Sequence, residues 1–430
     1  MPRIALISDH ASPLAALGGV DAGGQNVYVA QLSRHLPALG FEVDVFTRRD
    51  DPCQPDVVEL GPGARLLHVP AGPPARVPKE QLLPFMGAFS DFVMARAWAS
   101  GGYDLCHANF FLSALPAMAL KKAFGVPFVV TFHALGRVRL QHQGAADSFP
   151  RERLAIEERA VAEAGAVIAE CPQDRIDLRK LYFADPAKLR LVPCGFDPQE
   201  FAPRKKAEVR ARLGLEGGAF TVLQLGRMVP RKGVDNVIRG VARLRQRHGV
   251  AARLLVVGGE SHDPDPCVTP EIGRLQAVAA AEGVADAVTF VGARGRAELS
   301  DYYAACDVFV TTPWYEPFGI TPLEAMACGR PVVGSAVGGI RFTVRDKLTG
   351  YLVPPDDPEA LAGRLALLAR WPELRRRLGR NALARVRSRF TWAHVAEAVA
   401  RLYAEVLLGG PFALSRRARA RQRTGATALS

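Results

Sequence analysis

Apolar segments typical of buried strands alternate with helical patterns through the first half of the chain, and the alternation starts afresh after residue 220. Such alternation is typical of a parallel sheet wrapped by helices. A length of 430 residues also suits two domains of about 200 residues each. The sequence therefore predicts an α/β protein with two tandem Rossmann-like, doubly wound parallel sheets. The expected strands are Ile4–Ser8, Val43–Thr47, Leu66–Val69, Leu105–His107, Phe128–His133, Val167–Ala169 and Leu189–Val192, then Thr221–Gly226, Leu254–Gly258, Val288–Val291, Val308–Thr311 and Val332–Gly334.

Turn-forming and charged residues between positions 195 and 215 mark a linker. We therefore expect a first domain over residues 1–200 and a second over 210–388, followed by an amphipathic helix over 390–408. Residues 411–430 hold five arginines and no acids, which predicts a disordered basic tail. Helices are expected between these strands, for example Val27–Leu39, Gln81–Ala99, Leu112–Phe124 and Arg153–Ala164 in the first domain.

The composition indicates a soluble globular protein, with 49% apolar and 23% charged residues. No apolar run reaches the ~18 residues that span a bilayer, and the first residues lack the layout of a signal peptide. We therefore expect a cytoplasmic location. The seven cysteines are an odd number, widely spaced and mostly inside apolar strand or helix patterns, so reduced, buried thiols are expected.

The net charge is +12, and much of the basic excess lies in the C-terminal part. A basic surface attracts nucleic acid, anionic lipid or phosphorylated small molecules. Because aromatic interleaving and nucleic-acid motifs are absent from the sequence, we expect no nucleic-acid partner. Peripheral association with a membrane surface and homodimer formation stay open.

Two carboxylates stand eight positions apart, at Glu316 and Glu324, after the apolar run 308–310. The first acid falls on the loop at the carboxyl end of a strand, and the second falls one turn into the next helix. Both can therefore face one small ligand. The backbone N–H groups of Gly319 to Thr321 lie at the start of that helix and favour an anion such as a diphosphate. A solvated helix start with two surface acids is the alternative.

This stretch, Glu316-Pro317-Phe318-Gly319-Ile320-Thr321-Pro322-Leu323-Glu324, resembles the glutamate-pair motif of retaining nucleotide-sugar glycosyltransferases of the GT-B fold. That family, glycosyltransferase family 4, includes sucrose-phosphate synthase and the mycothiol-pathway glycosyltransferase. The resemblance implies that Glu316 contacts the hydroxyls of the donor sugar and that Glu324 contacts the nucleotide ribose. It also implies a cleft between two domains and a last helix that crosses back to the first domain. The donor-binding residues implied here are Glu316, Phe318, Gly319, Ile320, Thr321 and Glu324.

Two cations follow the first strand of the second series, at Arg227 and Lys232. Cations at this spacing can clamp both phosphates of a nucleoside diphosphate, although a solvated basic turn is the alternative. The match to the family's Arg and Lys implies that they neutralise the leaving group, which is electrostatic work that needs no metal or other cofactor. Arg294 resembles the family position that lies along the base and ribose.

Glycine pairs follow the first strand at Gly18-Gly19 and at Gly23-Gly24, and Gln25 and Asn26 come next. Glycines let the backbone approach a ligand closely, and a helix start suits a phosphate. The stretch is not a G-x-G-x-x-G dinucleotide fingerprint, but it resembles the Gly-Gly-Gln loop of sucrose-phosphate synthase. We expect Gly24 to close over the donor phosphates, with Gln25 and Asn26 near the acceptor.

Two histidines end expected strands of the first sheet, His107 and His133. A lone histidine at a strand end is more often structural than catalytic. His133 lies in Thr131-Phe132-His133-Ala134, which resembles a family motif whose histidine approaches the transferred sugar. We therefore expect His133 to act with Glu316, Arg227 and Lys232 in catalysis. His107 is a candidate acceptor-binding residue and is equally compatible with a structural role.

Acceptor recognition is the least constrained part of the sequence. The region around Lys79 resembles the sucrose-phosphate synthase and mycothiol branches, whose acceptors are phosphorylated polyols or sugars. Lys79, Arg137 and Arg153 are therefore candidates to receive an acceptor phosphate. However, Phe110 and Ala134 stand where the mycothiol enzyme uses a tyrosine and a threonine, and phenylalanine offers no hydrogen-bond donor.

The sequence also holds one Asp-x-Asp, at Asp263 and Asp265, with His262 and Cys267 as further metal-ligand types. Flanking prolines favour an ordinary surface loop, so we expect no metal site. The expected activity is metal-independent, retaining transfer of a hexosyl group from a nucleoside diphosphate sugar to an acceptor hydroxyl of a sugar phosphate, a polyol, or a glycan or lipid-linked molecule. A nucleotide-sugar epimerase, a phosphorylase on the same fold and a non-catalytic nucleotide-sugar-binding protein are the alternatives.

Overall fold

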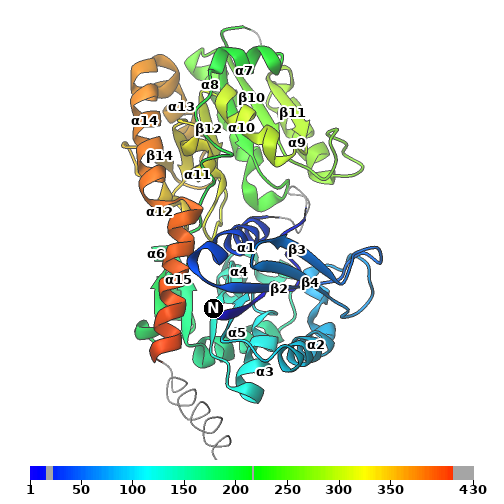
Figure 1. Cartoon of the computed structure of the whole chain (residues 1–430). Helices are drawn as coiled ribbons and strands as arrows, with labels where there is room; N and C mark the ends of the chain where they lie inside the picture. Colours follow the sequence, from blue (N-terminus) through cyan, green and yellow to red (C-terminus); the bar gives the residue numbers. More distant parts are fainter. Residues whose placement is uncertain (16–22, 216, 410–430) are drawn as a thin grey trace, which may run out of the picture.

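Each predicted series of strands forms one sheet in the computed structural model, which describes residues 1–15, 23–215 and 217–409 (Figure 1). The first sheet has the order β3-β4-β2-β1-β5-β6-β7-β8, and the second has the order β11-β10-β9-β12-β13-β14. All neighbouring strands are parallel except β3, which is antiparallel to β4. The expected α/β architecture is confirmed. The strands are β1 Arg3–Ile7, β2 Glu42–Arg48, β3 Val57–Gly61, β4 Ala64–Val69, β5 Leu105–Asn109, β6 Phe128–Thr131, β7 Ala166–Ala169, β8 Leu189–Leu191, β9 Phe220–Leu225, β10 Ala252–Val257, β11 Val288–Gly292, β12 Val308–Thr311, β13 Val332–Ser335 and β14 Gly350–Val353.

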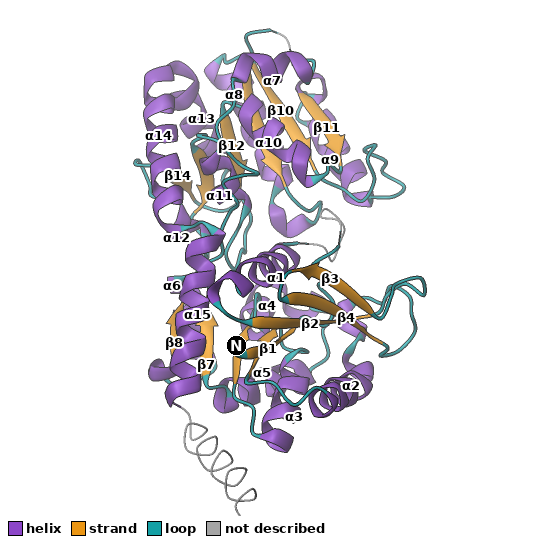
Figure 2. Ribbon diagram, in the orientation of Figure 1, coloured by secondary structure: helices purple, strands orange, loops and turns teal. Residues whose placement is uncertain are grey.

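Helices surround both sheets (Figure 2). Those of the first lobe are α1 Gly24–His35, α2 Met86–Ala99, α3 Ala114–Phe124, α4 Gly136–Gln143, α5 Glu152–Glu163 and α6 Pro172–Leu181. Those that follow are α7 Lys206–Arg212, α8 Val234–His248, α9 Pro270–Ala281, α10 Arg296–Ala305, α11 Thr321–Ala327, α12 Ile340–Thr343, α13 Pro358–Arg370, α14 Pro372–Arg389 and α15 Trp392–Gly409. Short 3-10 turns include η2 Lys79–Gln81 and η6 Pro230–Lys232.

The structure differs from the expected elements in four places. Strand β3 was missed because it is a partly exposed edge strand, and β14 was missed because it is short and begins with a glycine, which weakens a strand pattern. His107 lies inside β5 rather than at its end. The expected linker contains helix α7. The expected basic tail over 411–430 falls outside the described residues.

Helix α15 leaves the second lobe and runs along the first (Figure 1). Its Trp392 and Tyr403 are buried, and the Tyr403 hydroxyl lies 2.6 Å from Nδ1 of His107 in β5. Just before the helix, Thr391 pairs with Phe196 in an isolated bridge. The expected crossover of the last helix is therefore present, and it ties the lobes together through buried contacts.

Burial of the thiols follows the apolar patterns only in part. Cys53 and Cys267 are exposed, whereas Cys106, Cys171, Cys194, Cys306 and Cys328 are buried, and all seven are free. In the part of the chain that the structure describes, no helix has the length and apolar character required to cross a bilayer.

Candidate active site

A cavity of about 760 Å³ lies between the lobes. Its lining residues follow the carboxyl ends of strands from both sheets, for example His133 after β6 and Arg227 after β9. Open α/β sheets bind ligands at this edge, because the turns between strands and helices gather there. The position and size of the cavity therefore suit a small-molecule substrate.

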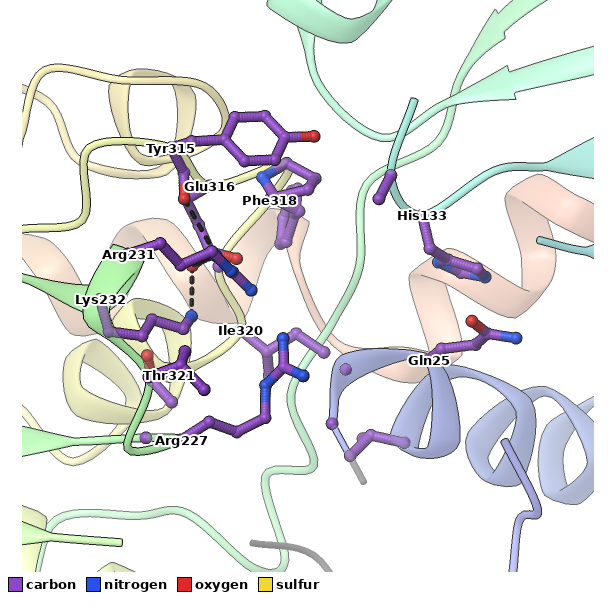
Figure 3. A pocket seen from close by; sticks show the side chains of 18 of the residues that line it. Gln25, His133, Arg227, Arg231, Lys232, Tyr315, Glu316, Phe318, Ile320 and Thr321 are labelled. Carbon is purple, nitrogen blue, oxygen red and sulfur yellow. Dashed lines mark hydrogen bonds and ion pairs between the residues drawn. The ribbon is translucent and has the colours of Figure 1, made fainter. Parts of the chain in front are cut away.

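Glu316 is the acidic centre of the second lobe's wall. Its Oε2 atom accepts a hydrogen bond from Nζ of Lys232 and lies 3.5 Å from Nη1 of Arg231 (Figure 3). Burial alone would raise the pKa of this carboxyl, but the neighbouring cations lower it to about 2. No hydrogen bond to Oε1 is found among the described residues, so this oxygen can accept from a ligand.

Lys232, whose side chain is 15% exposed, lies among more positive than negative charge. Burial lowers its pKa to about 8, and Arg231 and Arg227 lower it as well, while Glu316 only partly offsets these effects. The lysine is held at the end of η6 by Gly233, whose φ is +63°. A Cβ at position 233 would lie 2.1 Å from the carbonyl oxygen of Thr312, so only glycine fits there. This wall is therefore organised to receive an anion.

The loop that carries Glu316 packs against a second loop of the same lobe. The N–H of Gly339 donates to the carbonyl of Glu316 at 3.3 Å. Gly338 has a φ of +41°, and a Cβ there would lie 1.9 Å from the same carbonyl oxygen. Phe318 is 3% exposed and lines the cavity. Close backbone packing thus sets the position of the Glu316 carboxylate.

Glu324 lies in the first turn of α11, as the spacing predicted. Its Oε2 accepts from the hydroxyl of Tyr303 at 2.9 Å, and its Oε1 accepts from Nη1 of Arg296 at 3.1 Å. Glu324 lines the cavity at only 3% exposure. Both oxygens are thus oriented by the protein before any ligand is bound.

The start of α1 faces this wall from the first lobe (Figure 3). A Cβ added at Gly23 would lie 3.8 Å from Nε of Arg227, and one at Gly24 would lie 3.4 Å from Cδ1 of Ile320. Gln25 reaches back to Oγ of Ser8 and to the carbonyl of Asn109, each at 3.2 Å. The backbone at the start of α1 therefore comes close to the side chains of Arg227 and Ile320. Gly18 and Gly19 fall outside the described residues.

Asn26 also lines the cavity, but its side chain is used within the loop. Its Oδ1 accepts from the N–H of Gly23 at 2.9 Å, and its Nδ2 donates to the carbonyl of Ser12 at 3.0 Å. Such a capping interaction fixes the start of a helix. The geometry thus gives Asn26 a structural role in shaping the loop.

His133 lines the cavity opposite the cations (Figure 3). Its Nδ1 lies 3.0 Å from Oε1 of Glu170, and its Nε2 lies 3.1 Å from Oδ1 of Asn109. The amide nitrogen of Asn109 donates to the carbonyl of Ile7 at 3.2 Å, which turns the amide oxygen toward the histidine. Both ring nitrogens therefore face acceptors. His133 also has a φ of +57°, a strained conformation for this residue type.

Three of the predicted acceptor residues do not reach the cavity. His107 is fully buried between Tyr403 and Thr131, and burial lowers its pKa to about 3. Arg137 pairs with Glu158 outside the cavity. Arg153 is 2% exposed and pairs with Glu157 at 2.8 Å, because α5 places the two side chains on one helical face. These residues were predicted from a position near a strand end or from their positive charge. Neither feature shows whether a side chain is buried.

Arg294 and Lys79 do line the cavity, as predicted. The Nη1 atom of Arg294 is held by the carbonyls of His262 and Ala293, each at 2.7 Å. Lys79 Nζ lies 3.6 Å from a carboxylate oxygen of Glu80. These contacts fix two positively charged side chains on opposite sides of the site.

Several cavity residues were missed from the sequence. Arg231 is adjacent to Lys232 in the same turn, and Glu170 is an acid that directly follows an expected strand. Both residues could therefore have been predicted from the sequence. Arg296 also lines the cavity, and its Nη2 is buried without a hydrogen-bond partner in the described chain. Its position two residues after Arg294 is the only sequence signal.

The Asp-x-Asp stretch forms a surface loop. Asp263 is almost fully exposed, and Asp265 accepts from the N–H of Cys267 at 2.8 Å. Over residues 1–15, 23–215 and 217–409, no group of three or more His, Cys, Asp or Glu side chains is arranged to hold a metal ion.

Comparison with known families agrees with this geometry. Residues 23–195 match the model of a glycosyl transferase 4-like domain, and residues 205–385 match that of glycosyl transferases group 1. A D-inositol 3-phosphate glycosyltransferase from Actinosynnema mirum is 39% identical over 414 residues, which cover 94% of this chain and 97% of the relative. The chain belongs to the GT-B glycosyltransferases. The family to which the sequence pointed is thereby confirmed.

Solved structures show the same relationship. The glycosyltransferase is similar to sucrose-phosphate synthase from Thermosynechococcus elongatus, with a TM-score of 0.88, 37% identity and coverage of 95% of this chain and 100% of the other. It also shares its fold with Anabaena HepE, solved in complex with UDP-glucose, at a TM-score of 0.71, 19% identity and coverage of 94% and 99% of the two chains. The glycosyltransferase is thus a nucleotide-sugar enzyme of the GT-B type.

Proposed function

We propose that this glycosyltransferase transfers a hexosyl group from a nucleoside diphosphate sugar to an acceptor hydroxyl, with retention of anomeric configuration and without a metal ion. The observation that carries the proposal is the pairing of two cations, Arg231 and Lys232, with the one carboxylate of Glu316 at the cavity wall. Two cations on one acid leave positive charge to neutralise a diphosphate. Two relatives, a D-inositol 3-phosphate glycosyltransferase and a sucrose-phosphate synthase, support a phosphorylated polyol or sugar as acceptor.

The donor occupies the second lobe's wall in this proposal. Arg227, Lys232 and the backbone N–H groups of residues 319–321 bind the diphosphate. Oε1 of Glu316 accepts from hydroxyls of the sugar, and His133 closes the sugar pocket from the other lobe. Glu324 orients the ribose with Arg296, while Arg294 lies along the base.

The acceptor enters from the first lobe, past Lys79 and Gln25. The bond between the anomeric carbon and the diphosphate oxygen breaks, and a bond from that carbon to the acceptor oxygen forms on the same face of the sugar. The hydroxyl proton passes to the leaving diphosphate. Arg227 and Lys232 stabilise the charge that develops on this oxygen, which is where preorganised cations lower a barrier most.

A matrix of nucleotide sugars against sugars, sugar phosphates, polyols and lipid extracts tests this function. The full chain should release nucleotide and form a product heavier by one hexosyl residue with at least one pair. NMR of the product should show the donor's anomeric configuration, and a chelator should leave the rate unchanged. Epimerised donor without any acceptor product, an inverted product, or loss of the rate in chelator would overturn the corresponding part of the proposal.

A further inference from the structure

The chain between the two lobes reaches the donor side of the cavity through one ion pair. This joining segment, residues 192–205, lies between β8 and α7 and contains Glu200. Oε2 of Glu200 accepts a hydrogen bond from Nε of Arg296, the first residue of α10. Arg296 lines the cavity, whereas Glu200 is not among the described residues that do so. A carboxylate outside the cavity therefore holds a cation that faces the ligand.

Two further contacts fix the guanidinium of Arg296. Its Nη1 donates to Oε1 of Glu324 at 3.1 Å, and its central carbon lies 5.0 Å from the ring centroid of Phe201. Phe201 follows Glu200 directly in the joining segment and is buried. A guanidinium is planar and carries five N–H groups in a fixed arrangement, so these contacts determine where its remaining donors point.

One nitrogen of this guanidinium is left without a protein partner. Nη2 of Arg296 is buried and makes no hydrogen bond to any part of the chain that the structure describes. The side chain as a whole is 20% exposed and lines the cavity, so a ligand can reach it. A buried donor without an acceptor is unfavourable. A ligand oxygen at this wall would remove that penalty.

The groups beside Arg296 restrict what the ligand can present. Oε2 of Glu324 accepts from the hydroxyl of Tyr303 at 2.9 Å. Burial and the nearby Glu324 raise the pKa of Tyr303 well above its ordinary value, so this hydroxyl remains a donor. Each carboxylate oxygen keeps a lone pair for a ligand, and an anion would be repelled. A ligand that donates to Glu324 and accepts from Arg296 therefore needs neighbouring polar groups without charge, as in the two hydroxyls of a ribose.

We propose that Glu200 is a positioning residue for recognition of the donor's ribose. In this proposal, which rests on the proposed function, Glu324 accepts from the ribose hydroxyls and Nη2 of Arg296 donates to the 2′-oxygen. Glu200 holds the guanidinium where this contact can form. The donor is therefore a ribonucleoside diphosphate sugar rather than a 2′-deoxyribonucleoside one, and the joining segment contributes to that selectivity.

Matched nucleoside diphosphates test this proposal on the full chain. The affinities of UDP, ADP and GDP are each compared with that of the 2′-deoxy form by calorimetry. We expect the best ribose form to bind at least tenfold more tightly than its partner, because a missing hydroxyl leaves polar groups of the site unpaired. A preference among bases with equal affinity for both forms would overturn the proposal. Failure of every nucleoside diphosphate to bind would instead overturn the proposed function.

Two variants separate positioning from a general structural role. Glu200→Gln removes the charge that holds Arg296. We expect the preference for the ribose form to fall at least threefold, while the affinity of the 2′-deoxy form stays unchanged. Arg296→Lys keeps the charge but loses the planar guanidinium, and it should lower the preference at least as far. An unchanged preference in either variant, or equal weakening of both forms in Glu200→Gln, would contradict the proposal.

Asp301→Asn is the matched control. Asp301 also lies on α10, and its Oδ1 lies 2.5 Å from Nη1 of Arg204 in the joining segment. Neither residue is among the described residues that line the cavity. The variant thus breaks a second ion pair between the same two parts of the chain and should leave the preference for ribose unchanged. A fall equal to that of Glu200→Gln would assign the effect to attachment of the joining segment and would overturn the proposal.

Discussion

At the scale of single residues, Lys232 shows how burial and charge are balanced in this cavity. Its ammonium pairs with Glu316, yet burial and the two nearby arginines lower its pKa to about 8. A donor diphosphate would add negative charge beside it and favour the protonated form. Donor binding should therefore be linked to the protonation of this side chain.

This linkage predicts a pH dependence of donor affinity. Because the charged amine binds the diphosphate, affinity should be nearly constant up to about pH 7 and should fall as the pH rises through 8. The donor Kd should be about tenfold higher at pH 9 than at pH 7, since only about one lysine in ten keeps its proton there. Calorimetry across this range checks it. Lys232→Arg keeps its charge at both pH values. A similar rise of the donor Kd in that variant would show that a group other than Lys232 titrates.

The sequence predicted those site residues that lie close together within one short segment. Glu316, Glu324, Arg227 and Lys232 come from compact stretches whose residue order fixes their local geometry. The partners of His133 could not be read this way, because Asn109 and Glu170 lie in separate strand ends that only the sheet order brings together.

At the scale of elements, apolar runs located most strands, and errors arose where a strand is exposed or short. The same limit affected Arg153, since a helical pattern places it on α5 but does not show that Phe110 and Phe149 cover it. Burial depends on which loops pack over an element, and those loops carry weak sequence patterns. Loop packing also decides the position of Glu316.

Gly338→Ala tests that loop packing. The added Cβ would meet the carbonyl of Glu316, so the loop must shift and the carboxylate must move from Lys232. We expect donor affinity to fall about tenfold or more, since displacements near 1 Å are costly in such sites. Gly363→Ala on α13 is the control, because a Cβ there meets nothing within 4 Å and should leave affinity and stability intact. Equal affinity in both variants would show that the loop tolerates movement.

At the scale of the whole molecule, helix α15 and contacts across the cavity hold the two lobes together. The sequence predicted the crossover helix through its resemblance to the family. It could not predict the buried hydrogen bond between Tyr403 and His107, because 296 positions separate the two residues. This bond connects the last helix to the centre of the first sheet.

Tyr403→Phe removes that hydrogen bond and leaves Nδ1 of His107 buried without its partner. We expect the free energy of unfolding to fall by about 1–3 kcal/mol, as for other buried groups left unsatisfied. Denaturant unfolding measures the change. Tyr351→Phe is the matched control, since the Tyr351 hydroxyl makes no hydrogen bond within the described residues, and its loss should cost less than about 0.5 kcal/mol. A similar loss of unfolding free energy in both variants would show that the hydrogen bond between Tyr403 and His107 adds no particular stability.

The central claim is that the cavity between the lobes transfers a hexosyl group with Glu316 at its centre. The turnover of Glu316→Gln, measured on the best donor and acceptor pair, tests it most directly. We expect kcat to fall about 100-fold or more, because the charge that faces the donor sugar is lost. Circular dichroism should show an intact fold, and calorimetry should show that the nucleoside diphosphate still binds. Turnover within about threefold of the native rate in a well-folded Glu316→Gln protein would contradict the claim.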